Sequence, residues 1–516
     1  MGTNAPFGAY PKWATDANNN VTGLVGPDLA THATLGSSTI TVGAGGRYST
    51  IQAAIDSITD NLPVNHSSGT VNVANGSAQI TFSAAPANDK VVAGRDLFTV
   101  DGSRYYQLLN GPTVTGGAIY NLAEVYQGST NAAATYSVIK PNPRTIILLP
   151  GVYDYTGYTL AQNILLKPYV NLVGVSRDGC IIRRNKNNST PDTTPVMAIA
   201  HGCVVENLTI DATDGHFLCY RMGLTARGTS QTQAMKYSKW GLRNVALLNK
   251  DPNGIDPGAD YDIDSSYYNS DEMLLDGCYF EHCWDGFTWK TAGSGRLKVT
   301  FNNPIIYKTP FPKGLYQTGA AFIRTGVQAA STTDVVMINP IYDQRTFAAG
   351  EVVNDSIGGL IAGAGGTTGG CYGMLFVGGG STGKVLNPAI DMDVGSNYGR
   401  NAGVGLAGTA GTSELTVIGG YINIAGAAAA GGTDNNSDGA FNELAAGTLT
   451  VCGTRIDSGK NGVRQLTAGG VTNLQGGARI KGTTNSLVNT AGTMNQSANV
   501  SLAGVATSGT ITSAET

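Results

Sequence analysis

Eight short segments between residues 204 and 457 share one pattern, and this repeat constrains the fold more than any other feature. Each segment has an apolar stretch interrupted by Asn or Gly at its fourth position, followed by a short, mostly apolar piece. The separations between these marker residues vary from 26 to 48 residues, as a constant structural unit with variable loops would produce. The markers are Asn207, Asn244, Gly277, Asn303, Asn339, Asn387, Gly419 and Gly453.

The repeated segments have the composition of β-strands. They are rich in Val and Ile and bounded by Gly, Asn and Asp, and helical periodicity is nearly absent after residue 60. The marker predicts a sharp bend between sheets, where the backbone must be left-handed or otherwise unusual. A stack of such coils, each resting on its neighbours, is a parallel β-helix. A β-sandwich array would instead show hairpin turns at regular short spacing.

An open end of a β-helix exposes unpaired strand edges and must be covered. The segment YSTIQAAIDSI, at residues 48–58, predicts a helix that supplies the cover. Its residues Ile51, Ala54, Ile55 and Ile58 form one apolar helical face.

The segments RYSTIQAAID, IILLPGVY and KPYVNLVGVSRDGCII resemble the opening of pectin-lyase-like right-handed β-helices, across residues 46–211. The resemblance implies an all-β fold: a right-handed parallel β-helix with an N-terminal capping helix. The sequence is also close to how pectinesterases begin. It lacks the esterase motifs of that family, so the resemblance does not imply that activity.

Residues 69–139 alternate like short antiparallel strands and are similar to a small β-module of bacteriophage tail fibre and tailspike proteins. With a start that lacks a secretory signal and an end rich in Gly, Thr, Ser and Ala, the whole chain looks like a phage tailspike. The resemblance implies a homotrimer in the virion that binds, and often cuts, bacterial surface polysaccharide. It also implies attachment to a phage tail or baseplate protein through the N-terminus and synthesis in the host cytoplasm.

We therefore expect five parts along the chain: an attachment or neck segment (1–45), the capping helix (46–66), an inserted small β domain (67–139), the β-helix (140–480) and a C-terminal trimer-contact tail (481–516).

Composition argues against some partners. The formal charge of −4 disfavours nucleic acid, which requires clustered Lys and Arg. No apolar run reaches the ~18 residues that suggest a membrane span, so we expect no membrane insertion. Seven cysteines without CxxC spacing are expected to be small buried hydrophobic residues in a reduced compartment rather than zinc ligands.

The repeat predicts which side chains face outward. The third position after each marker should point inward, as in Ile210, Leu247, Phe280, Ile306, Tyr342 and Ile390. The next position should point outward, as in Asp211, Leu248, Glu281, Tyr307, Asp343 and Asp391. Asp211 and Glu281 would then lie two coils apart, about 9–10 Å at the backbone. The carboxyl groups of inverting glycosidases are about 6.5–9.5 Å apart, so this spacing permits such a pair.

The stretch YFEHCWDGFTWK (279–290) concentrates acids and aromatic rings in a chain with 13% charged and 8% aromatic residues. We expect Phe280 and Cys278 in the core. The candidate catalytic residues are Glu281, Asp285, Asp211 and Asp214, and structural hydrogen bonding is the alternative role for these acids. Candidate substrate-binding residues near this stretch are Trp284, Trp289, Lys290 and Arg243. The chain from Val404 onward has few acids or aromatic rings. Asp391 and Asp393 lie just before this stretch and are weaker candidates.

Residues 249–272 form the most acidic segment, and three roles stay open for it. It can be a solvated loop, a calcium site at residues 251–264 without an EF-hand register, or the lining of a sugar groove. In the last case carboxylates bind sugar hydroxyls and tyrosine rings cover sugar faces. The residues that would do so are Asp260, Tyr261, Asp262, Asp264, Tyr267, Tyr268 and Glu272. We expect no other metal or cofactor.

Three functions remain open: a hydrolase that uses two carboxylates, a polysaccharide lyase, and a receptor-binding spike without catalysis. A lyase acts on an acidic uronate polymer, which a groove rich in acids would repel. The excess of acid over base in residues 249–285 therefore favours hydrolysis.

Overall fold

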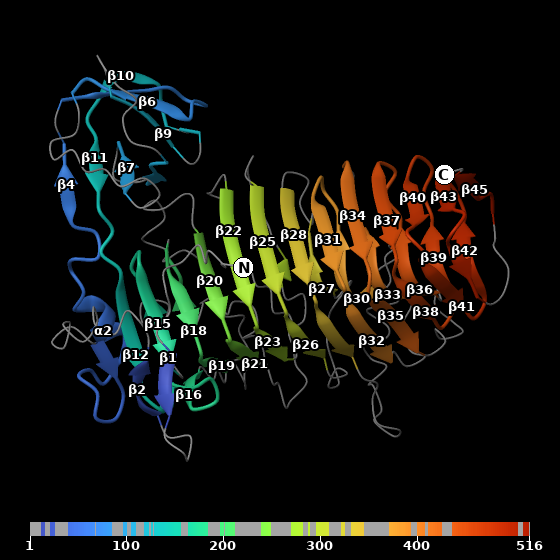
Figure 1. Ribbon diagram of the computed structural model, residues 1–516, viewed down its shortest axis with the longest axis horizontal. Helices are drawn as coiled ribbons and strands as arrows, with labels where there is room; N and C mark the ends of the chain where they lie inside the picture. The colour runs from blue at the N-terminus through green and yellow to red at the C-terminus, as the bar shows by residue number, and fades with distance from the viewer. Residues whose placement is uncertain are drawn as a thin grey trace, which may run out of the picture.

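The computed structural model shows a rod of stacked coils with a small β-module beside its N-terminal end (Figure 1). It describes residues 12–15, 21–25, 40–67, 69–84, 96–100, 105–109, 118–122, 125–126, 128–155, 164–183, 197–200, 202–211, 239–248, 270–281, 287–288, 296–308, 321–325, 332–344, 371–393, 400–407, 411–425, 436–503 and 509–514.

Three parallel sheets run along the rod in these residues. The first sheet has 14 strands: β3 (Ile40–Val42), β12 (Arg144–Leu148), β15 (Val170–Gly174), β18 (Val204–Glu206), β20 (Lys239–Arg243), β22 (Ser270–Asp276), β25 (Arg296–Asn302), β28 (Thr332–Ile338), β31 (Thr382–Leu386), β34 (Ser413–Ile418), β37 (Gly447–Cys452), β40 (Val471–Gln475), β43 (Thr493–Ser497) and β45 (Thr512–Ala514). The second sheet has 12: β13 (Gly151–Asp154), β16 (Cys180–Arg183), β19 (Thr209–Asp211), β21 (Ala246–Leu248), β23 (Tyr279–Glu281), β26 (Ile305–Lys308), β29 (Ile341–Gln344), β32 (Ala389–Asp393), β35 (Tyr421–Ala425), β38 (Arg455–Ser458), β41 (Arg479–Gly482) and β44 (Ser501–Leu502).

The third sheet has seven described strands: β24 (Phe287–Thr288), β27 (Ala321–Arg324), β30 (Cys371–Val377), β33 (Arg400–Leu406), β36 (Asn436–Asn442), β39 (Asn461–Gln465) and β42 (Asn485–Asn489). A two-stranded parallel pair, β14 (Ile164–Leu165) and β17 (Met197–Ala198), and an antiparallel pair, β1 (Lys12–Thr15) and β2 (Val21–Val25), complete this part. Successive coils pair in parallel in all three long sheets, which confirms the parallel β-helix and excludes a sandwich array.

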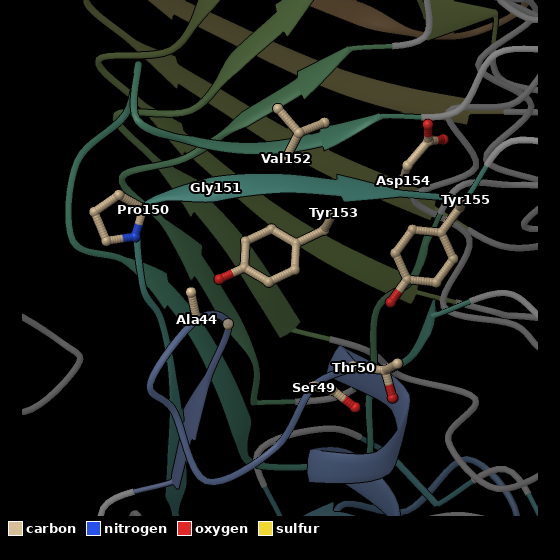
Figure 2. Close-up of a pocket in the computed structure, with 10 residues that line it drawn as sticks. Ala44, Ser49, Thr50, Pro150, Gly151, Val152, Tyr153, Asp154 and Tyr155 are labelled. Carbon is tan, nitrogen blue, oxygen red and sulfur yellow. The ribbon is translucent and has the colours of Figure 1, made fainter.

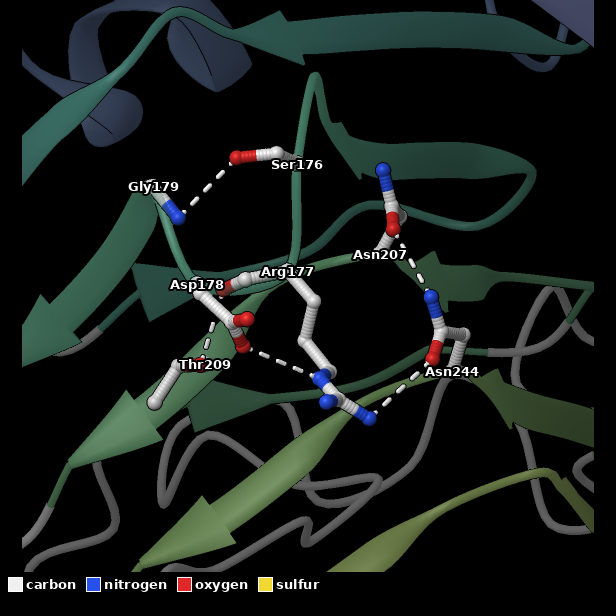
Figure 3. Close-up of polar contacts among 7 residues, drawn as sticks. All are labelled: Ser176, Arg177, Asp178, Gly179, Asn207, Thr209 and Asn244. Carbon is white, nitrogen blue, oxygen red and sulfur yellow. Dashed lines mark hydrogen bonds and ion pairs between the residues drawn. The ribbon is translucent and has the colours of Figure 1, made fainter.

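All eight marker residues lie at the bend between the first and second sheets in left-handed conformation, with φ from 47° to 68°. Asn tolerates this conformation because its short amide side chain can hydrogen-bond locally. Asn244 Nδ2 donates to Asn207 Oδ1 at 2.8 Å, and Arg177 lies against Asn244 at the end of this pair (Figure 3). A second run joins Asn387 to Asn339 at 3.2 Å and Asn339 to Asn303 at 3.0 Å. The marker therefore specifies the bend, and the amide groups of the Asn markers named here join the bends of neighbouring coils.

The side chains expected to point inward form part of one continuous core. Ile210, Leu247, Phe280, Ile306, Tyr342 and Ile390 are all at most 1% exposed. Cys278 also lies in this core, as expected. Phe280 packs edge-on against Phe301 and Phe322, with ring centroids 6.1 and 5.0 Å apart. The inward half of the predicted column pattern is thus confirmed.

The prediction that the cysteines are buried holds for three of the four whose side chains are described. Cys180, Cys203 and Cys278 are buried and free. Burial raises the pKa of Cys203 and of Cys278 to about 12, so these thiols stay protonated at neutral pH. Cys452 is the exception: it is only half-buried, because the residue before each marker faces outward from the first sheet.

The capping helix α2 (Ile51–Asp56) covers the N-terminal end of the core. Thr50 caps it by accepting a hydrogen bond from the Ala53 N–H at 3.2 Å. The buried residues Ile51, Ala54 and Ile55 pack with β3, β12 and β14, and Ile58 joins the same core just after the helix ends. Among the described residues, no helix has the length and apolarity to cross a membrane.

The small module consists of two four-stranded antiparallel sheets. One contains β10 (Asn131–Ala134), β5 (Val71–Val73), β6 (Gln79–Phe82) and β9 (Ala118–Asn121); the other contains β4 (Val64–His66), β11 (Ser137–Ile139), β7 (Leu97–Thr99) and β8 (Tyr106–Gln107). A separate aromatic core holds them together, in which the Phe82 ring lies 5.1 Å from Tyr120 and 4.6 Å from Tyr136. The module begins at Val64, ahead of the boundary expected at 67.

The expected tail at residues 481–516 is part of the rod in its described residues. Strands β42, β43, β44 and β45 continue the three sheets beyond residue 480. Polar side chains support these last coils: Asn495 Nδ2 donates to Asn473 Oδ1 at 2.9 Å, and Asn489 Nδ2 donates to the Thr510 carbonyl at 2.6 Å. The Gly- and Thr-rich composition predicted a tail because it has few apolar residues for a core. The side-chain hydrogen bonds that hold these coils together cannot be predicted from composition.

Candidate functional site

Two columns of register positions run along the second sheet, one residue per coil, and their described side chains lie on its outer face. The acidic column follows the register Asp154, Arg183, Asp211, Leu248, Glu281, Tyr307, Asp343, Asp391, Asn423, Asp457 and Lys481. The apolar column, two residues earlier in each strand, follows Val152, Ile181, Thr209, Ala246, Tyr279, Ile305, Ile341, Ala389, Tyr421, Arg455 and Arg479. Side chains in neighbouring coils are about 4.8 Å apart at the backbone.

At its two ends the acidic column contains ion pairs. Arg183 Nε lies 3.2 Å from Asp211 Oδ2, and the Asp211 side chain is only 13% exposed. At the other end Asp457 lies 2.8 Å from Arg455 and 3.7 Å from Lys481. Asp211 and Asp457 are therefore held by basic neighbours.

The middle of the acidic column, from Glu281 to Asn423, contains no Lys or Arg. Asp343 and Asp391 are direct register partners on neighbouring strands. Asp391 accepts a hydrogen bond from the Tyr421 hydroxyl at 2.6 Å and one from Asn423 Nδ2 at 3.0 Å. The hydrogen bond from the Tyr421 hydroxyl to Asp391 is the main cause that raises the pKa of Tyr421. Burial and the charges of Asp391 and Asp343 raise it further. The Tyr421 hydroxyl therefore remains a donor, and Asp391 is fixed as an acceptor.

The apolar column beside this middle part is exposed. Ile305, Ile341 and Tyr421 are 43%, 48% and 39% exposed, and they are among the most exposed large apolar side chains of the described residues. Tyr279 precedes Ile305 in the column and is half-buried. Exposed apolar side chains in a row, next to carboxylates, offer both kinds of contact that a sugar ring makes.

The backbone spacing of the acids in this column is compatible with the carboxyl separations of both glycosidase geometries. The backbone positions of Glu281 and Asp343 are two coils apart, as are those of Asp211 and Glu281, which is about 9–10 Å. Asp343 and Asp391 are one coil apart, near the ~5–5.5 Å carboxyl spacing of retaining enzymes. The column can therefore position an acid and a second carboxylate on a glycosidic bond.

The structure brings Asp211 and Glu281 into one column, two coils apart, as the sequence predicted. For Glu281 only the backbone position is described, in β23. Of the other main predicted site residues, only Arg243 and Glu272 are described. The possible calcium site at 251–264 lies outside the described residues, and so do Asp214, Asp260, Tyr261, Asp262, Asp264, Tyr267, Tyr268, Trp284, Asp285, Trp289 and Lys290.

Two predicted substrate-binding residues, Glu272 and Arg243, lie on the first sheet, across the bend from Glu281. Glu272 is part of strand β22 rather than of the acidic loop, because Met273 and Leu275 carry the strand's inward pattern back through this segment. Arg243 lies 3.9 Å from Glu206 and 3.7 Å from Asp276, carboxylates on the coils before and after it. Its guanidinium therefore already has carboxylate partners, and the structure does not bring it to the acidic column.

Sequence reasoning gave no role to Tyr421 or Asp343 and treated Asp391 as secondary. Asp343 and Asp391 could have been found, because the outward position after each marker identifies both residues as neighbours on successive coils. The repeat does not identify Tyr421 in this way. Tyr421 lies in the apolar column, one coil after Asp391, and reaches Asp391 across the two columns.

No protein-family model matches this sequence, and no curated protein matches it either. Among solved structures, the chain is similar to the catalytic unit of a thermostable GH87 alpha-1,3-glucanase from Streptomyces thermodiastaticus strain HF3-3, at 9% identity and a TM-score of 0.26. The similarity covers 88% of this chain and 96% of that one. A TM-score this low carries no argument about activity, and the parallel β-helix rests on the strand pairing described above.

Proposed function

We propose that this protein is a phage tailspike that binds a bacterial surface polysaccharide along the outer face of the second sheet and cleaves it by glycosidic hydrolysis. The observation that carries the proposal is the middle of the acidic column. There Asp343 and Asp391 follow one another without a basic residue, beside exposed Ile305, Ile341 and Tyr421.

Like charges on directly opposite strand positions destabilise a sheet, so the pairing of Asp343 with Asp391 is not one that stabilises the sheet. A glycan gives a reason for this arrangement, since carboxylates accept hydrogen bonds from sugar hydroxyls and a tyrosine ring covers the apolar face of a sugar. The row continues over five coils, from Tyr279 to Tyr421, which is about 19 Å of sheet. A polymer of several sugar units suits this length better than a single small molecule.

Hydrolysis requires one carboxyl group that donates a proton to the leaving oxygen and a second that acts as base or nucleophile. We propose that the pair comes from Glu281, Asp343 and Asp391, with Asp285 as a further candidate. Asp391 suits the role of base or nucleophile because hydrogen bonds from Tyr421 and Asn423 hold its carboxylate in place. Asp211 is less suited to catalysis, because Arg183 already holds it.

Incubation with purified surface glycans from candidate hosts tests this function. We expect saturated oligosaccharides, and we expect Glu281→Gln or Asp343→Asn to abolish their release while retaining glycan binding. Unsaturated, ultraviolet-absorbing ends would instead show a lyase. Unchanged release by both variants and by Asp391→Asn would remove this column from the mechanism.

A receptor-binding spike without catalysis is the second candidate. The observation that favours it is the fixed Asp391 carboxylate, since an anchored acceptor is what sugar recognition requires. Retention of glycan without any release, in the same incubation, would support this alternative.

We further propose that three copies assemble about a three-fold axis, because the last strands of a long rod need protection and contact between copies supplies it. The mass of the full chain in solution, from light scattering at micromolar concentration, tests this assembly. A monomeric mass would contradict it.

A further inference from the structure

The second sheet begins one coil later than the first. In the first sheet β3 pairs in parallel with β12, whereas the second sheet starts at β13, the strand that follows β12. After Val42 the chain turns back, bridges to Val42 through Tyr48 and enters α2. Within the described residues, no strand therefore occupies the second-sheet position beside β13 that would complete the coil of β3.

A cavity of about 430 Å³ lies at this position (Figure 2). Residues 150–155 line one side of it, and Gly43, Ala44, Ser49 and Thr50 line the other. Figure 2 shows the strand Gly151–Asp154 between its neighbouring strand and the turn that carries Ala44 and Ser49. The cavity thus lies along the edge of β13 that faces away from β16.

Backbone groups of β13 point into this cavity. The N–H groups of Gly151 and Tyr155 donate to the carbonyls of Gly179 at 2.8 Å and Arg183 at 2.7 Å, on the side of β16. Backbone direction alternates along a strand, so the N–H and C=O of Val152 point the opposite way. The Val152 side chain is 50% exposed. An edge with these properties is a template for another strand.

We propose that the edge of β13 accepts an extended segment of another protein as an added parallel strand. The occupant is a peptide because what the site offers is a backbone donor and acceptor at strand spacing, and β13 spans about 13 Å, enough for four extended residues. The added strand takes the place that the coil of β3 leaves vacant, and this coil position makes the pairing parallel.

Side chains around the edge set a preference for the peptide sequence. The residue opposite Val152 faces outward beside an exposed aliphatic side chain, which favours a β-branched residue. The residue opposite Tyr153 faces inward, where the single O–H of Tyr153 lies between the carbonyls of Val42 at 2.8 Å and Leu149 at 2.6 Å and donates to them. A Cβ atom placed on Gly43 would come within 2.5 Å of that hydroxyl, so the space is narrow and favours a small residue.

Hydrogen exchange of the full chain tests the proposal with an acetylated, amidated peptide of sequence Lys-Thr-Val-Gly-Val-Thr-Lys. In the free protein, the Val152 amide should exchange faster than the Tyr153 amide, which points at β16. At saturating peptide its exchange should slow by at least about tenfold, with Tyr153 unchanged. Absence of this slowing, or a Val152 amide already protected as strongly as that of Tyr153, would overturn the proposal.

Val152→Pro removes the N–H on the cavity side and retains the pairing with β16, and edge strands accept proline in this orientation. We expect it to weaken peptide binding by at least about tenfold in fluorescence anisotropy, whereas Val152→Thr binds within about threefold of the unsubstituted chain. Peptides N-methylated at alternate positions make the same test without changing the protein. Methyl groups on the amides that face β13 should abolish binding, and methyl groups on the other amides should not. Equal binding by Val152→Pro or by both methylated peptides would contradict an added strand.

Discussion

The acidic column has two kinds of stretch, although both stand on the same sheet and follow the same register. At the ends charges alternate in sign, as in the pairs Arg183 with Asp211 and Asp457 with Lys481. In the middle, Asp343 and Asp391 are neighbours with Tyr307 before and Asn423 after them, and no cation stands in the column. The ends follow the rule that opposite charges on neighbouring strands stabilise a sheet, and the middle departs from it. Under the proposed function, the ends of the column hold the rod together and the middle binds the glycan.

The largest effect should distinguish the two stretches in function. Asp343→Asn and Asp391→Asn, each made alone, should reduce glycan turnover by about 100-fold or more, since loss of a catalytic acid or base costs about 10²–10⁴ in rate. Asp457→Asn, the matched change at the C-terminal end of the column, should alter turnover by less than about threefold. Initial rates of oligosaccharide release measure all three. A loss caused equally by Asp457→Asn would remove the distinction between middle and end.

Stability should change in opposite directions in the two stretches. Arg183→Met leaves the largely buried Asp211 carboxylate without its guanidinium partner and should lower the free energy of unfolding by about 1–3 kcal/mol. Asp343→Asn removes one of two like charges at paired strand positions and should raise the free energy of unfolding by about 0.2–1 kcal/mol. Denaturant unfolding at neutral pH provides the measurement. A destabilising Asp343→Asn would mean that the middle carboxylates also support the fold.

The pH dependence of stability should show a smaller effect at Tyr421. Its pKa is raised in the folded protein, chiefly by the hydrogen bond to Asp391, so the folded state keeps a proton that the unfolded state releases near pH ~10. The contribution of protonated Tyr421 to the free energy of unfolding is therefore fully present below pH ~10, and it is lost as pH rises through the raised pKa. Asp391→Asn should reduce this alkaline loss. Thermal unfolding between pH 9 and 11, chosen around the ordinary tyrosine value of ~10, should show a shallower slope for the variant, and parallel curves would contradict the assignment.

The sequence predicted most of the rod because a residue that tolerates a left-handed backbone recurs once per coil at the bend. Asn207, Asn244 and Gly277 mark bends that only a few residue types tolerate, and the alternation after each bend fixes which side chains face inward. It did not predict that Cys452 faces outward, because apolar residues stand on both sides of these strands. Nor did it predict that Arg243 is engaged by Glu206 and Asp276, since those contacts join residues on three different coils.

The candidate site was only partly predictable for a related reason. A marker fixes the register within its own coil, so the column of Asp211, Glu281, Asp343 and Asp391 follows from the sequence. The contact of Tyr421 with Asp391 depends on side-chain direction between columns, which register alone does not specify. Most of the substrate-binding residues predicted from the sequence lie in the acidic loop, residues 249–272, rather than in the strands. Most of that loop lies outside the described residues, so the loop predictions stay predictions.

The most direct measurement is a crystal structure of the protein with an oligosaccharide taken from a polysaccharide that it binds. We expect sugar units along the outer face of the second sheet, stacked beside Tyr421 and hydrogen-bonded to Asp343 and Asp391. An oligosaccharide bound instead on the outer face of the first or third sheet, with this column bare, would contradict this expectation.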